Sequence, residues 1–171
     1  MAKLNNITVE LSLPGIGSIQ GNWSPDETEQ RAAWELYVEL ITRVSTANVQ
    51  NNTGSLREAL SSLHSLFGTT RQILKTYGPD IARPKGTSIL SLGYISITIL
   101  NSILRPFLLK WHPLLLDFEA KKPENISPID YEDDWEQYET FRRELKVIQE
   151  AILDYANLLA EAAKVPKLSS S

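Results

Sequence analysis

The strongest constraint on the fold is a long apolar repeat in the C-terminal third of the chain. Its members follow one another at steps of three or four residues: Tyr131, Trp135, Tyr138, Phe141, Leu145, Ile148, Ile152, Tyr155, Leu159 and Ala162. This period places every member on one face of an α-helix and approaches a coiled-coil heptad. Ser127 and Pro128 are typical of a helix start, and Pro166 of a stop. The pattern predicts one helix over residues 128–163 and a loose tail over residues 165–171.

Two earlier helices are predicted from capping residues. A helix over residues 25–47 opens with a capping box in which Ser24 caps and Glu27 reaches back. A second helix, over residues 56–77, opens at Ser55 in the same way. Apolar residues recur at helical spacing in both, so each helix has one face for a core.

A third helix is predicted over residues 88–121, kinked or divided at Pro106, which removes a backbone donor. It overlaps a stretch of 19 uncharged residues, 86–104, close to the length of a membrane span. Most of the polar residues in this stretch recur on one side, which favours a buried helix of a soluble bundle. We therefore expect no membrane span and a cytoplasmic location.

The N-terminal segment alternates apolar and polar residues, with Ile7, Val9, Leu11 and Leu13 on one side. This period of two predicts a half-buried strand, and the turn that follows makes residues 7–23 a β-hairpin. A chain of 171 residues is the size of one domain. The expected fold is therefore all-α: an up-down four-helix bundle with a short N-terminal hairpin.

The predicted helices differ in length, so the third and fourth overhang the first two. Large apolar side chains gather on the overhang: Phe107, Trp111, Leu115, Tyr131, Trp135 and Tyr138. Aromatic residues of this kind often form the centre of protein interfaces, which predicts docking of a partner or a second copy. The alternative is that these side chains cover one another as ordinary core.

The composition excludes several chemistries. The chain has no Cys, two His and one Met, which removes disulfides, thiol catalysis and Cys-ligated metals. The Glu-x-x-His motif of di-iron bundles is absent, and so is Gly-x-Ser-x-Gly. We expect no metal, no cofactor and no enzymatic activity. The net charge of −4 argues against a binder of duplex nucleic acid.

Charge is unevenly distributed along the chain. Residues 1–39 carry a net charge of −4, residues 40–115 carry +6 and residues 116–171 carry −6. Within the basic part, helical spacing aligns one cationic stripe on residues 56–77, to which the third helix adds a further arginine: Arg57, His64, Arg71, Lys75 and Arg105. The stripe is either a solvated, salt-bridged face or a binding surface for an anion such as a nucleotide or an acidic partner.

One local run resembles a known group of proteins. The run from Arg105 through Phe107 and Leu108 to Trp111-His112-Pro113, together with residues 34–43, is similar to a family of uncharacterised bacterial helical proteins. The resemblance implies a helical fold and a bacterial source. No activity is known for that family, so it assigns no catalytic residue.

Three functions follow from these patterns. The first is a non-enzymatic helical protein that binds a partner or itself, as an accessory or regulatory component. The second is a sensor that binds a small anionic ligand at the cationic stripe. The third is an enzyme of unrecognised type.

Overall fold

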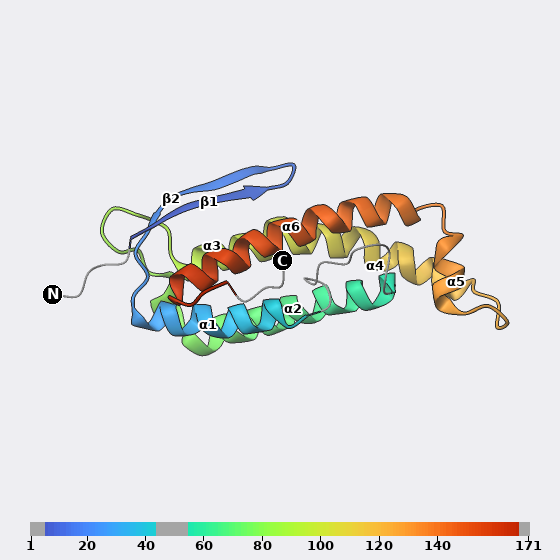
Figure 1. The fold of residues 1–171 in the computed structure, drawn as a ribbon, viewed down its shortest axis with the longest axis horizontal. Coiled ribbons are helices and arrows are strands. Elements are labelled where there is room, and N and C mark those ends of the chain that lie inside the picture. The colour runs from blue at the N-terminus through green and yellow to red at the C-terminus, as the bar shows by residue number, and fades with distance from the viewer. Residues whose placement is uncertain (1–5, 44–54, 168–171) are drawn as a thin grey trace.

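The computed structural model describes residues 6–43 and 55–167, which are mostly helical and include one two-stranded antiparallel hairpin (Figure 1). Its elements are β1 (Ile7–Leu13), β2 (Gly17–Trp23), α1 (Glu27–Ile41), α2 (Leu56–Tyr77), the 3-10 helix η2 (Pro79–Ala82), α3 (Leu92–Ile99), the π-helix η3 (Leu100–Leu104), α4 (Arg105–Ala120), α5 (Pro128–Asp133) and α6 (Tyr138–Ala162). The helical class is confirmed. The molecule is elongated, with the hairpin along one side and α5 at one end (Figure 1).

The predicted hairpin is confirmed. β1 pairs antiparallel with β2 in a register that sets Ile7 opposite Trp23 and Leu13 opposite Gly17. Residues in β1 alternate between buried and exposed, as the period of two requires. The buried side of β1 packs against α6, which gives the two strands a core to cover.

The prediction for the start of α1 was wrong by two residues. Asp26, not Ser24, is the N-cap: its carboxylate accepts a hydrogen bond from the Glu29 amide at 2.8 Å. Glu29, not Glu27, completes the capping box by accepting from the Asp26 amide at 3.2 Å. The helix ends at Ile41, and residues 44–47 of the predicted helix lie outside the described residues.

Glu29 is also the centre of a buried polar network, and its side chain is fully buried. Its carboxylate accepts hydrogen bonds from the Trp23 indole at 2.8 Å and from the Leu92 amide at 2.9 Å. Lys85 forms an ion pair with it. The Glu29 side chain therefore joins β2, α1 and the start of α3. These contacts favour Glu29 over Glu27 as the residue that completes the capping box.

The predicted range of α2 is confirmed, and a distant residue supports its first turn. Ser55 is the N-cap and accepts from the amides of Arg57 and Glu58. The buried Glu132 of α5 accepts from the Leu56 amide at 3.1 Å and from the Ser55 hydroxyl at 3.2 Å. Amides at a helix start have no partner within the helix, so Glu132 satisfies one of them.

The third predicted helix is confirmed as one continuous stretch from Leu92 to Ala120, but it starts four residues late. Ser88, the predicted start, instead donates from its hydroxyl to the Asn22 carbonyl at 2.5 Å, and Ser91 caps the helix. The π-helical turn η3 lies just before Pro106. Because the proline ring has no N–H and would crowd the carbonyl four residues earlier, a wider turn there relieves the conflict.

The stretch from Leu92 to Ala120 is long and apolar enough to cross a membrane by length and composition. In its most apolar window, 56% of the residues are buried inside the molecule. The core helix of a soluble protein passes the same test, so this is only a weak indication of a span.

The single helix predicted over residues 128–163 was wrong. The structure has α5 and α6, separated at residues 134–137. In this break Trp135 turns toward α4, where its ring stacks on Phe118 at a centroid distance of 5.2 Å. It also meets the edge of Trp111 at 5.8 Å. In the break, the amides of Asp134, Trp135 and Tyr138 still donate to carbonyls three residues earlier.

Candidate functional site

The cationic stripe predicted on α2 is divided in the structure. Arg57, at its start, is paired with Glu119 of α4: the Arg57 Nε lies 3.0 and 3.1 Å from the two carboxylate oxygens. Both side chains are about one-third exposed, with values of 28% and 32%. Arg57 is therefore a link between α2 and α4 and not a free cation.

His64, the next residue of the stripe, faces the other histidine of the chain. Its ring stacks on His112 of α4 with centroids 6.3 Å apart. Both residues are exposed. Within the described residues no group of three His, Asp or Glu side chains lies close enough to hold a metal ion. The histidine pair is thus a second contact between α2 and α4.

The other three cations of the stripe line one pocket. Arg71 and Lys75 come from α2, and Arg105 from the first residue of α4. The pocket has a volume of about 460 Å³ and lies between α2, η2 and the α3–η3 stretch. Its walls are mainly apolar side chains: Phe67, Leu74, Ile81, Ile97 and Leu100. We call it the α2–α3 pocket.

The two arginines of the α2–α3 pocket share one aromatic ring. The guanidinium carbon of Arg71 lies 5.2 Å from the centroid of Phe67, and that of Arg105 lies 5.7 Å from it. Both distances fall within cation–π range. The ring therefore holds two like charges close together at the edge of an apolar surface.

No acidic side chain neutralises these cations. Arg71, Lys75 and Arg105 form no ion pair within the described residues. All of the chain's Asp and Glu residues belong to that described part. All three cations are exposed, so water screens their repulsion but leaves their positive potential open to an anion.

The local sequence explains how this pocket forms. Phe67, Arg71 and Lys75 are four residues apart, so they follow one face of α2. Gly78, with φ of 77°, turns the chain into η2. Gly93 lets α3 approach η2 closely, since a Cβ there would lie 2.7 Å from the Cβ of Ala82.

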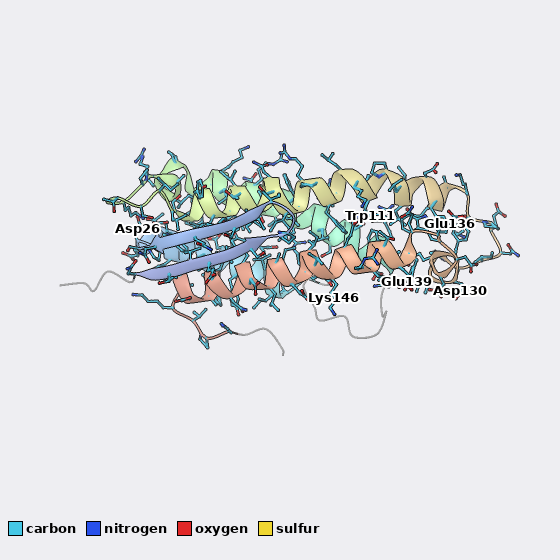
Figure 2. The ribbon with its side chains drawn as sticks, turned by 90° about the horizontal axis from the view of Figure 1, so that it is seen from above. Asp26, Trp111, Asp130, Glu136, Glu139 and Lys146 are labelled. Carbon is cyan, nitrogen blue, oxygen red and sulfur yellow. The ribbon has the colours of Figure 1, made fainter. Side chains whose placement is uncertain are left out.

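The aromatic residues predicted as an interface lie in the core instead. Phe107, Trp111 and Leu115 of α4 and Tyr138 of α6 are buried. Two others are partly buried: Trp135 as described above, and Tyr131, whose ring stacks on Phe118 at 4.2 Å. The interface prediction is therefore wrong for the buried residues, and the alternative, that these side chains cover one another as ordinary core, agrees with the structure. The reason is that α5, α6 and the 134–137 turn fold back over α4. Trp111 lies between α4 and α6 in Figure 2.

Glu144 of α6 connects this cluster to the surface. It accepts from the Trp111 indole at 2.7 Å and pairs with Lys110 at 2.6 Å. Partial burial raises the pKa of Glu144, but the bonds from Lys110 and Trp111 outweigh burial and hold the pKa below its usual value. A second pocket of about 450 Å³ opens beside this pair, against the hairpin turn.

Acidic side chains are gathered at the α5 end of the molecule. Asp130, Glu136 and Glu139 lie there, at the end opposite to Asp26 (Figure 2). They are exposed. Asp130 and Glu139 lie in the first turns of α5 and α6, where the helix dipole favours negative charge.

The sequence reasoning missed the apolar half of the pocket. Helical spacing alone places Phe67 on a core face of residues 56–77, and Ile97 and Asn101 within the uncharged stretch 86–104. The four-residue spacing of Phe67 and Arg71 was the available signal for a ring beside a cation. The contribution of Ile97 and Asn101 depends on how α3 crosses α2, which periodicity does not give.

No family model, curated protein or solved structure matches this chain. The resemblance around Arg105 and Trp111 therefore stays a prediction. Functional reasoning then depends on the geometry of the pocket and the charge around it.

Proposed function

We propose that this protein binds a small amphipathic anion, with a carboxylate or phosphate head on an apolar body, in the α2–α3 pocket. The proposal rests on one observation: three cations that have no acidic partner line an apolar pocket. This is the sensor hypothesis, restricted to Arg71, Lys75 and Arg105. Arg57 and His64 are engaged elsewhere.

The size and chemistry of the pocket support this ligand class. A volume of about 460 Å³ is within the range of ordinary small-molecule sites. Planar guanidinium groups suit carboxylate and phosphate oxygens, and a bound anion lowers the repulsion between Arg71 and Arg105. The apolar walls contribute binding through burial of the rest of the ligand. A purely polar anion would leave those walls hydrated.

The partner-binding hypothesis stays a second proposal, but it needs a different surface from the one first predicted. Four of its six predicted contact residues are buried. We also propose that the long helices form the up-down bundle expected from the sequence. Contacts of α1 with α2 and α6, and of α2 with α4, support that arrangement.

Thermal unfolding with decanoate as probe tests the ligand proposal. Binding to the folded state adds about 2.7 kcal/mol at a ligand concentration 100 times Kd, which raises Tm by several degrees. Decanol, with the same chain and no charge, should give a smaller shift. The variant Arg71→Gln/Arg105→Gln should lose most of the decanoate shift, whereas Arg31→Gln, an exposed arginine of α1, should keep it.

Three outcomes contradict the proposal. These are no shift with decanoate, equal shifts with decanoate and decanol, and an unchanged decanoate shift in the double variant. A shift with ADP that exceeds the decanoate shift and needs the same arginines would replace the amphipathic ligand with a nucleotide.

A further inference from the structure

The exposed apolar side chains of this protein are concentrated on one stretch of chain. Of the ten large apolar residues exposed in the described part, six lie between Ile89 and Leu116. Most of these are on one side of the long helix. Exposed residues follow one another there at steps of three or four and form what we call the α3–α4 outer face: Tyr94, Ile97, Arg105, Leu109, His112 and Leu116, with Asn101 between the second and third.

The cations beside this face are only in part paired with acids. Four Lys and Arg residues and no Asp or Glu lie between Asp80 and Asp117 in the sequence. Arg83, Lys85 and Lys110 of this stretch form ion pairs, and Arg105 forms none. Arg105 lies on the face itself, and Arg71 and Lys75 lie beside it across the α2–α3 pocket. Asp130, Glu136 and Glu139 lie at the α5 end of the molecule, beyond the Leu116 end of this face (Figure 2).

The shape of the face argues against a second copy as its occupant. From Tyr94 to Leu116 the helix extends about 33 Å, and its apolar residues are separated by polar ones. In a two-fold dimer through this face, Arg105 and its neighbouring cations would approach the same cations of the other copy. No acid of this stretch would offset that repulsion. A lipid bilayer, with anionic headgroups above an apolar layer, fits both the cations and the separated apolar residues of this face.

We propose that the α3–α4 outer face lies on an anionic phospholipid surface, with the helix parallel to the bilayer plane. Leu109, Leu116 and Tyr94 insert between the headgroups, and Arg105 contacts phosphate oxygens. The helix does not cross the bilayer, because its opposite side packs in the core through Ile95, Leu104 and Trp111. The proposal does not depend on a ligand in the α2–α3 pocket.

Vesicle flotation tests the proposal with variants outside the pocket. The full chain is mixed with vesicles of phosphatidylcholine alone or with phosphatidylglycerol added. Binding is expected with the anionic vesicles, and should be weak with the neutral ones and fall as salt is raised. Leu109→Asp/Leu116→Asp should lower the partition coefficient at least about tenfold, through lost burial and added repulsion.

The matched control is Ile16→Asp/Ile129→Asp. These two residues are 63% and 58% exposed, against 70% and 55% for Leu109 and Leu116, but they lie on the hairpin turn and α5. The control should bind the vesicles like the unchanged protein. Neither double variant touches the α2–α3 pocket, so the decanoate shift should survive in both, and failure of one proposal is distinguishable from failure of the other.

Three results overturn the membrane proposal. The first is no binding to anionic vesicles, and the second is an equal loss in the control variant. The third is a dimer, seen by sedimentation without lipid, that Leu109→Asp/Leu116→Asp dissociates. That result would assign the face to a second copy of the chain. Circular dichroism of each variant verifies that it remains folded.

Discussion

At the scale of single residues, buried carboxylates organise much of this molecule. Glu29 and Glu132 are both buried and act as hydrogen-bond acceptors between elements far apart in sequence. Burying a charge is costly unless partners replace water, and each of these carboxylates has partners. The sequence marks them only as acidic residues near helix starts, which are normally exposed. Their partners from other elements, an indole, two backbone amides, a hydroxyl and the Lys85 ammonium, are set by the tertiary fold.

Glu144 gives a residue-scale prediction about pH. Its pKa in the folded protein is below the usual value, so ionised Glu144 stabilises the fold above its unfolded-state pKa. This contribution is lost as pH falls through the folded-state pKa. Glu144→Gln should therefore lower Tm at pH 7, and the difference from the unchanged protein should shrink as pH falls below about 4.5.

Parallel melts of both proteins from pH 7 to pH 3 measure the effect. Glu150→Gln, at an exposed residue of α6, changes the net charge by the same amount and is the control. A Tm difference that stays constant or grows toward pH 3 would contradict the assigned role of the Glu144 carboxylate.

At the scale of elements, periodicity identified where helices are but not where they stop. The apolar steps continue through Tyr131 and Trp135 into α6, so the pattern alone indicates one helix. Both side chains are indeed packed, but they reach Phe118 from a turn and a separate short helix. A regular spacing of apolar residues indicates that they are buried. A chain that folds back on itself can bury such residues as well as one continuous helix can. The hairpin and α2 were predictable because their turn and cap residues act locally.

Two glycines give an element-scale prediction. Gly93→Ala should destabilise the protein by about 1–3 kcal/mol, because the new Cβ would meet Ala82 at 2.7 Å and force η2 from α3. It should also weaken decanoate binding, since both elements line the α2–α3 pocket.

Gly68→Ala is the matched control in α2, where nothing lies within 4 Å of the added Cβ. Alanine is the better helix former, so this variant should be as stable or up to about 1 kcal/mol more stable. Urea unfolding measures both. Equal effects of the two substitutions would show that close approach of α3 to η2 is not what Gly93 provides.

At the scale of the whole molecule, the helices differ in length, and other parts of the same chain pack against the end of the longest one. The stretch from Leu92 to Ala120 has 29 residues and α1 has 15, so one end of the long helix extends beyond α1. That end is covered by α5 and packs in the aromatic cluster around Trp111. The sequence predicted the long third helix and the aromatic residues near its end, but the predicted length of the fourth helix was wrong, since α6 has 25 residues and α2 has 22. It did not predict the covering element, because α5 was read as the first turns of a longer helix.

Substitution of Trp111 tests whether the aromatic cluster at this end is core or an interface. Its side chain is fully buried against Phe141, Phe107 and Trp135. Trp111→Ala should cost about 3–5 kcal/mol of unfolding free energy, and the milder Trp111→Phe a smaller part of it. Trp34→Ala, at a half-exposed indole of α1, should cost about 1 kcal/mol or less. Native mass spectrometry should give the same assembly state for Trp111→Phe and the unchanged protein. If instead Trp111→Phe keeps full stability but loses a partner or a second copy, the cluster is an interface, and α5 must open to expose it.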